Sequence, residues 1–210
     1  MKKLLCFLLL TLTSFSMYIQ AQNYAYVTRS KDVLRSGPNT KSKRVVALQQ
    51  YEVVRLLEPS SKEWIKCETV TNYETDVCNR VQSGYIKASH LTILQATPVS
   101  NPQDLAGNTF DLMMPKKADF AGFINFDKNP TKDSKEILIN AFFRFYIPSW
   151  QREGGSGTTE VGEFTVGIDS EGALRIASAK FEYDNKTDPI FYDSKKKILL
   201  FYNMVWKMAR

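Results

Sequence analysis

The feature that most constrains the fold of this chain is an alternation of apolar and polar side chains with a period of two residues. The clearest case is Glu136–Ile147, in which every second residue is apolar: Ile137, Ile139, Ala141, Phe143, Phe145 and Ile147. Two residues is the period of a β-strand, in which successive side chains point to opposite faces. No window longer than about ten residues has the period of an amphipathic helix. The sequence therefore predicts an all-β fold.

A change in composition near residue 100 divides the chain into two modules. Pro98 and Pro102 flank Ser100 and Asn101, a combination typical of a connector. Most of the 13 phenylalanines follow residue 105. The aromatic strands of the second module are expected to close into an antiparallel β-barrel or to pack as a β-sandwich. The predicted division is a first domain over 22–95, a linker over 96–104 and a second β domain over 105–210.

Segments bounded by turn residues define the expected strands. In the first domain they are Tyr24–Thr28, Val33–Arg35, Arg44–Leu48, Glu52–Leu57, Trp64–Thr69 and Val81–Lys87. In the second they are Thr109–Met114, Ala121–Phe126, Glu136–Ile147, Glu163–Ile168, Ala173–Tyr183 and Ile198–Met208. Short helical turns are expected at 88–91 and 101–104.

Residues 1–21 have the features of an export signal. Two lysines precede an apolar segment, Leu4–Phe15, and a more polar stretch ends at Ala21. We expect cleavage after Ala21, and Ser14–Ser16 is a second possible cleavage site. A retained membrane anchor is the alternative, although the apolar segment is shorter than the about 18 residues that a span requires. The mature protein is therefore expected in the periplasm or at the cell surface.

The charge of the chain argues against nucleic acid as a partner. The formal charge of +6 falls by two when Lys2 and Lys3 are removed with the export signal. The remaining excess is spread along the chain, without a cluster of Lys and Arg interleaved with aromatic residues. The run Lys195–Lys197 is typical of a solvated turn.

Two of the three cysteines, Cys67 and Cys78, remain after Cys6 is discarded with the export signal. In an oxidising compartment, an even pair predicts a disulfide. Two thiolates and the distant His90 do not supply the four ligands of a structural zinc site. We therefore expect no metal and no cofactor.

His90 is the only histidine of the chain. Serine and cysteine triads need a histidine base, and zinc amidases need several histidines as ligands. These mechanisms are excluded, and no catalytic residue is assigned; His90 is expected to be half-buried and hydrogen-bonded. A hydrolase based on two carboxylates stays open, because glycoside hydrolysis requires no histidine.

Several motifs of the first domain occur in a characteristic order. They are Val33–Thr40 (VLRSGPNT), Val45–Leu48, Val53–Leu57, Glu63–Cys67, Gly84–Ile86 and Ala88–Leu91. In this combination, residues 24–93 resemble the bacterial SH3 (SH3b) family. Two features depart from the family pattern: Tyr85 replaces the usual tryptophan, and the segment between Trp64 and Gly84 is long.

The resemblance implies a small SH3-like barrel that binds extended ligands, such as cell-wall peptides. Two alternatives remain: Trp64 and Tyr85 would fill the core of the barrel, and Arg35 would support the adjacent loop. The candidate ligand contacts are Arg35, Asn39, Thr40, Tyr51, Trp64 and Tyr85.

The leading functional hypothesis is an exported, non-catalytic binding or scaffold protein. Its first domain would engage a cell-envelope peptide or protein, with peptidoglycan as one candidate, and its second domain would contact another partner. One alternative is a carrier that holds an apolar small molecule in the aromatic second domain. The other is a carboxylate-based hydrolase of cell-wall glycans.

Overall fold

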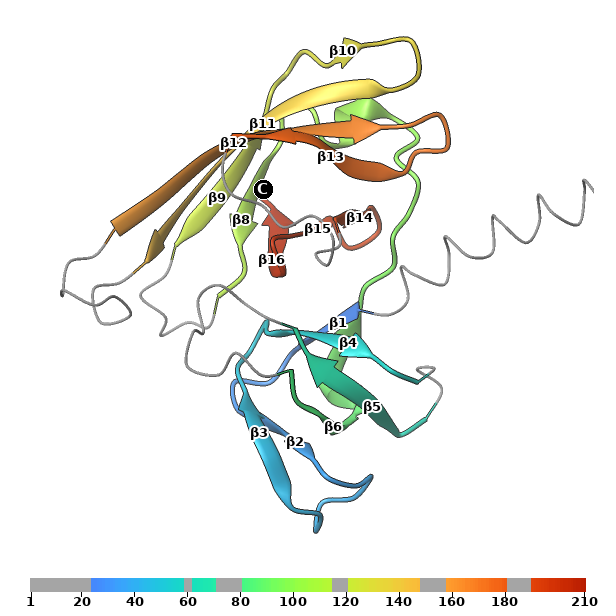
Figure 1. The fold of residues 1–210 in the computed structure, drawn as a ribbon, viewed down its shortest axis with the longest axis vertical. Helices are drawn as coiled ribbons and strands as arrows, with labels where there is room; N and C mark the ends of the chain where they lie inside the picture. Colours follow the sequence, from blue (N-terminus) through green and yellow to red (C-terminus); the bar gives the residue numbers. More distant parts are fainter. Residues whose placement is uncertain (1–23, 59–61, 71–80, 115–120, 148–157, 181–189) are drawn as a thin grey trace, which may run out of the picture.

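The structure is a computed structural model that describes residues 24–58, 62–70, 81–114, 121–147, 158–180 and 190–210. The described chain forms two antiparallel sheets, one in each module, at opposite ends of the molecule (Figure 1). It contains two short 3-10 helices and no α-helix, so the all-β prediction is confirmed for the described residues. The predicted export segment, 1–21, lies outside them.

The first module is a seven-stranded sheet with the strand order β3-β2-β6-β5-β4-β1-β7. A 3-10 helix, η1 (Ala88–His90), connects the last two strands at the expected turn. The strands are β1 (Tyr24–Val27), β2 (Asp32–Arg35), β3 (Arg44–Leu48), β4 (Val53–Leu56), β5 (Trp64–Thr69), β6 (Ser83–Lys87) and β7 (Leu91–Ile93). The sequence did not predict β7, which pairs with β1.

The inner face of this sheet carries the core of the first module. Alternate residues of each strand point inward, as in β5, where Ile65 and Cys67 are fully buried. The core cluster consists of Ala25, Val27, Leu34, Leu48, Val54, Leu56, Ile65, Cys67 and Ile86. Aliphatic side chains therefore fill this core, and both Trp64 and Tyr85 lie outside it.

The second module is a nine-stranded sheet. Eight strands follow the order β13-β12-β11-β9-β8-β16-β15-β14, and β10 pairs with β11 alone. The strands are β8 (Thr109–Leu112), β9 (Gly122–Phe126), β10 (Thr131–Lys132), β11 (Ile137–Ile147), β12 (Thr158–Ile168), β13 (Leu174–Ala179), β14 (Phe191–Asp193), β15 (Ile198–Phe201) and β16 (Met204–Met208). The terminal strands β13 and β14 contact each other, so the sheet is nearly closed.

Aromatic rings of the inner face pack against one another in the second module. Phe164 and Phe201 stack with ring centroids 4.5 Å apart. Phe110 makes edge contacts with Phe126 at 5.6 Å and with Tyr192 at 5.9 Å. Ring pairs of this kind are preferred in protein interiors. Among the described residues, this inner face is therefore packed with its own side chains.

The prediction of one strand over Ile198–Met208 was wrong. The segment forms a hairpin, β15 and β16, with Tyr202 and Asn203 in the turn. Both turn residues have positive φ angles, 58° and 55°. Two-residue hairpin turns of this hand match the twist of the strands, and asparagine tolerates the left-handed region.

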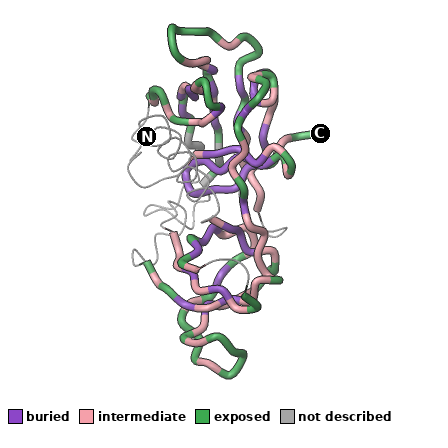
Figure 2. The backbone as a smooth tube through the Cα atoms, turned by 90° about the vertical axis from the view of Figure 1, so that its right-hand side faces the viewer, coloured by how far each residue is buried: buried purple, intermediate pink, exposed green. Residues whose placement is uncertain are grey.

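The two modules are joined by a shared apolar cluster. Figure 2 shows buried segments gathered toward the middle of the molecule and exposed segments at both tips. The cluster combines Tyr26, Val53 and Leu94 of the first half with Phe191, Ile198, Leu200 and Val205 of the second. Tyr24 contacts Phe191 across the boundary, with ring centroids 6.2 Å apart. This cluster holds the modules against each other.

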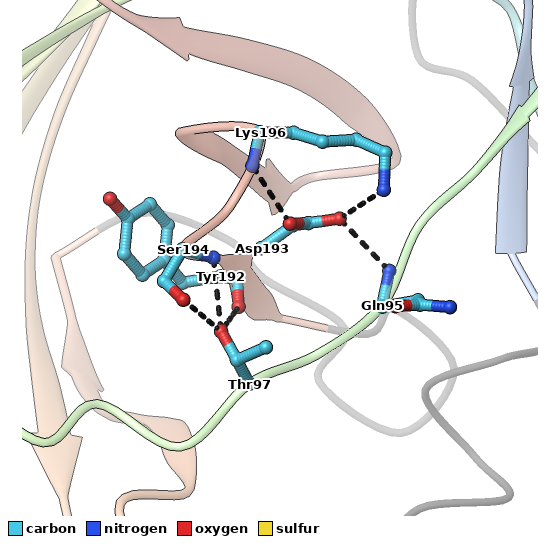
Figure 3. Close-up of polar contacts among 6 residues, drawn as sticks. All are labelled: Gln95, Thr97, Tyr192, Asp193, Ser194 and Lys196. Carbon is cyan, nitrogen blue, oxygen red and sulfur yellow. Dashed lines mark hydrogen bonds and ion pairs between the residues drawn. The ribbon is translucent and has the colours of Figure 1, made fainter.

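Polar contacts also fix the connector, residues 94–104, on the second module (Figure 3). The backbone N–H of Gln95 donates to the carboxylate of Asp193 at 3.2 Å, and the Lys196 ammonium donates to the same oxygen at 2.8 Å. The hydroxyl of Thr97 accepts from the Ser194 N–H at 2.9 Å. A 3-10 helix, η2 (Pro102–Asp104), ends the connector, within the helical turn predicted there.

Candidate functional site

The outer face of the first module displays side chains that alternate with its core residues. In β5, Trp64 and Lys66 point away from the core that contains Ile65 and Cys67. In β6, Tyr85 points outward between two buried neighbours, Gly84 and Ile86. Strand alternation therefore places both predicted aromatic ligand contacts, half-buried, on one outer face.

Three adjacent strands align a tyrosine between two cations. Tyr85 of β6 lies directly opposite Lys66 of β5 on one side and opposite Arg35 of β2 on the other. Directly paired residues share a face of the sheet, so these three side chains are neighbours. We call them the Lys66–Tyr85–Arg35 row.

Trp64 lies beside this row. It pairs with Lys87 of β6, whose ammonium lies 5.6 Å from the centroid of the indole ring. A cation at this distance over an aromatic face is attracted by the ring. Leu57, which is 43% exposed, donates its N–H to the carbonyl of Lys66 and so extends the face on the other side.

Gly84 sets the close approach of β2 to β6. A Cβ atom at this position would lie 2.8 Å from the carbonyl oxygen of Arg35 and 2.9 Å from Cβ of Leu34. Only glycine allows the backbones to come this near. The glycine thereby brings Arg35 beside Tyr85.

The loop between β2 and β3 is held by two of the predicted residues. The Arg35 guanidinium donates from Nη1 to the carbonyl of Ser42 at 2.9 Å. The side-chain oxygen of Asn39 accepts from the backbone N–H groups of Lys41 and Ser42, each at 2.9 Å. Asn39 and Thr40 are exposed. Arg35 therefore supports the loop, as the alternative prediction stated, and its backbone pairs with Tyr85.

Tyr51 lies apart from this face. Its ring packs against Tyr26 in the cluster between the modules, with centroids 6.0 Å apart. Its backbone has a positive φ of 69°, and its N–H donates to the Val27 carbonyl at 2.7 Å. Of the six predicted ligand contacts, the structure brings Arg35, Trp64 and Tyr85 together, keeps Asn39 and Thr40 in the adjoining loop and separates Tyr51.

The charges of the face differ in how they are paired. Lys87 lies 3.7 Å from the Glu63 carboxylate, and Arg55 pairs with Glu68. A hydrogen bond to Glu58 and the charge of that carboxylate raise the pKa of Lys62, with a smaller contribution from Tyr85. Within the described part of the chain, Lys66 and Arg35 have no carboxylate partner. Among the described residues, the row is therefore cationic and has no carboxylate partner.

Lys66 and Lys87 were missed in the sequence. The signal was present, because Lys66 is two residues from Trp64 in a predicted strand and Lys87 is two residues from Tyr85. Period-two spacing puts each lysine on the face of its aromatic neighbour. The register that joins the two strands into one face was not available from the sequence.

Cys67 lies on the inner face of β5. It is a free, fully buried thiol that points into the core of the first module, and burial raises its pKa to about 12. Its predicted partner, Cys78, lies outside the described residues. The Cys67–Cys78 disulfide therefore stays a prediction.

His90 is held in place by hydrogen bonds, as the sequence predicts. Its Nδ1 lies 2.7 Å from the carboxylate of Asp32, and its side chain is 15% exposed. Its carbonyl accepts from both the N–H and the hydroxyl of Thr28. These contacts tie η1 to the ends of β1 and β2.

Comparisons with known proteins do not identify a family. No protein-family model, no curated protein and no solved structure matches the chain. Over the described ranges, no group of three or more His, Cys, Asp or Glu side chains could hold a metal ion. No helix within those ranges is long and apolar enough to cross a membrane.

Proposed function

We propose that this chain is an exported, non-catalytic binding or scaffold protein. Its first module would be an SH3b-type domain that engages an extended peptide or protein segment of the cell envelope. The observation that carries this proposal is the outer face on which Trp64 and Tyr85 lie beside the Lys66–Tyr85–Arg35 row. Half-exposed aromatic rings that are flanked by hydrogen-bond donors are suited to binding an extended peptide.

The order of elements in the first module supports the proposed relation to the SH3b family. A long polar loop follows β2, a Trp-led strand pairs with the strand that contains Gly84–Ile86, and the short helix η1 precedes a final strand. The family motifs fall on these elements in the order that the resemblance implies. Gly84 has a physical role at the matched position, since a side chain there would push β2 away.

The environment of His90 supports a role without catalysis. A histidine base must reach a substrate, whereas the side chain of His90 is only 15% exposed. The aromatic packing of the second module favours a core filled by its own side chains, so we do not propose the apolar-carrier function. The carboxylate-based hydrolase stays a prediction.

Retention of the purified protein on cell-envelope material tests the proposal. The wild type should be retained on isolated peptidoglycan or on envelope protein at low salt, and Trp64→Ala and Tyr85→Ala should each weaken retention. Tyr146→Ala is a matched control, because Tyr146 is a 41% exposed aromatic residue of the other module. No retention of the wild type on either material, or equal retention of all four proteins, would contradict the proposal.

A further inference from the structure

We propose that the Lys66–Tyr85–Arg35 row is a subsite for a carboxylate of the bound chain. This inference rests on the proposed function and adds the chemical class of the ligand. The row places two cations, which have no carboxylate partner among the described residues, on either side of a phenol on three adjacent strands. Three other cations of the first module, Lys62, Lys87 and Arg55, have carboxylate partners within the protein. Among the described residues, Arg29, Lys31, Lys41, Lys43 and Arg44 have none, so Lys66 and Arg35 are distinguished by their position on either side of Tyr85.

The spacing of the row suits one carboxylate. Neighbouring strands of a sheet lie roughly 4.8 Å apart, so the backbones of Lys66 and Arg35 are about 10 Å apart across Tyr85. The long side chains of lysine and arginine can both reach a small anion above the ring between them. The Tyr85 hydroxyl supplies a third donor at the centre.

Arg35 is oriented before a ligand binds. Its Nη1 is held by the carbonyl of Ser42 at 2.9 Å, and its side chain is half-buried. The guanidinium is planar, so fixing one nitrogen fixes the directions of the remaining N–H donors. A group held in this way loses little conformational entropy when it binds an anion.

The surroundings of the row define what flanks the carboxylate. Trp64 lies along β5 on one side and the 43% exposed Leu57 lies opposite Lys66. These two side chains suit a ligand in which small or apolar residues lie next to the carboxylate. A C-terminal carboxylate and the side chain of aspartate or glutamate share the required chemistry, and the test separates them.

The test uses the full chain and three N-acetylated alanine pentapeptides. One peptide has a free C-terminal carboxylate, one is amidated, and one is amidated with glutamate as its central residue. Dissociation constants come from NMR titrations at low ionic strength. At least one carboxylate peptide should bind about five-fold tighter than the neutral peptide, the effect of an exposed ion pair. The tighter peptide identifies a terminal or a side-chain carboxylate as the source.

Variants assign the preference to the row. Lys66→Gln should remove the preference for the carboxylate peptides over the neutral peptide. Lys207→Gln, an equal change of charge on β16 of the other module, should keep the preference. Thermal unfolding of both variants checks that they fold.

Two results would overturn the inference. Equal affinity of the wild type for all three peptides would remove the carboxylate subsite and leave a peptide-binding face. Binding of none of them would also reject it, and retention of the protein on envelope material would then decide separately whether the proposed function holds.

Discussion

The carboxylate of Asp193 accepts a hydrogen bond from the backbone N–H of Gln95 at 3.2 Å, which links the second module to the first residues after β7. Asp193 is only 1% exposed. Burial alone raises the pKa of Asp193, but hydrogen bonds from the side chain and N–H of Lys196 and from Gln95 outweigh it, so the pKa lies below the ordinary value of 3.8. The ionised carboxylate therefore stabilises the fold.

Asp193→Asn should destabilise the protein by about 1–3 kcal/mol at neutral pH, because it removes a buried, charge-assisted set of hydrogen bonds. The stabilisation by Asp193 is present above its unfolded-state pKa and is lost as the pH falls through its lower folded-state pKa. The difference between wild type and variant in urea unfolding should therefore shrink in acid below about pH 4. A difference that grows on acidification would contradict this assignment.

The shared cluster between the modules should make them unfold together. Leu94 is fully buried in this cluster, so Leu94→Ala should lower the free energy of unfolding by about 2–5 kcal/mol. The single calorimetric transition of the wild type should then separate into two. Leu34→Ala is the control, because Leu34 is equally buried but lies in the core of the first module alone. Two transitions in the wild type would show that the cluster does not couple the modules.

Gly84→Ala should destabilise the first module by about 1–3 kcal/mol, the usual range for overpacking. The added methyl group would meet the backbone of Arg35, which cannot move without shifting β2. The variant should also lose affinity for the ligand of the outer face, because Arg35 moves away from Tyr85. Ser83→Ala, at the exposed neighbouring position, should leave both measurements unchanged.

The Cys67 thiol should be unreactive in the folded protein. A pKa of about 12 keeps it neutral at pH 8, and the side chain is fully buried. In a Cys6→Ser/Cys78→Ser variant, a chromogenic disulfide reagent should detect one thiol only after denaturant is added. Rapid reaction without denaturant would place Cys67 at the surface. In the unsubstituted chain, non-reducing mass spectrometry tests the predicted Cys67–Cys78 disulfide.

Patterns within single strands were predictable from the sequence. The bounds of Arg44–Leu48 and Trp64–Thr69 agree with β3 and β5, because both follow turn-rich segments. Trp64–Thr69 also alternates between inward and outward side chains. The hairpin of β15 and β16 was hidden for a physical reason. Ile198 and Leu200 face the cluster between the modules, whereas Leu199 and Phe201 face the core of the second. A strand buried on both faces is continuously apolar and does not alternate.

The candidate site was predictable in part. The candidate contacts Trp64 and Tyr85 followed from the motifs that resemble the SH3b family, but the choice between core and surface depended on which face of each strand was buried. The separation of Tyr51 from Arg35 is a consequence of three-dimensional packing, since Tyr51 contacts the cluster between the modules. Long-range placement of this kind leaves no local pattern in the sequence.

The double burial of β15 has a consequence for how the chain can mature. The first module contains enough strands to pair its own backbone early, yet Tyr26, Val53 and Leu94 are covered by side chains that are synthesised much later, such as Leu200 and Val205. During synthesis, the first module would thus expose an apolar surface until the hairpin of β15 and β16 forms. Folding of the first module is therefore complete only when the second module has been made.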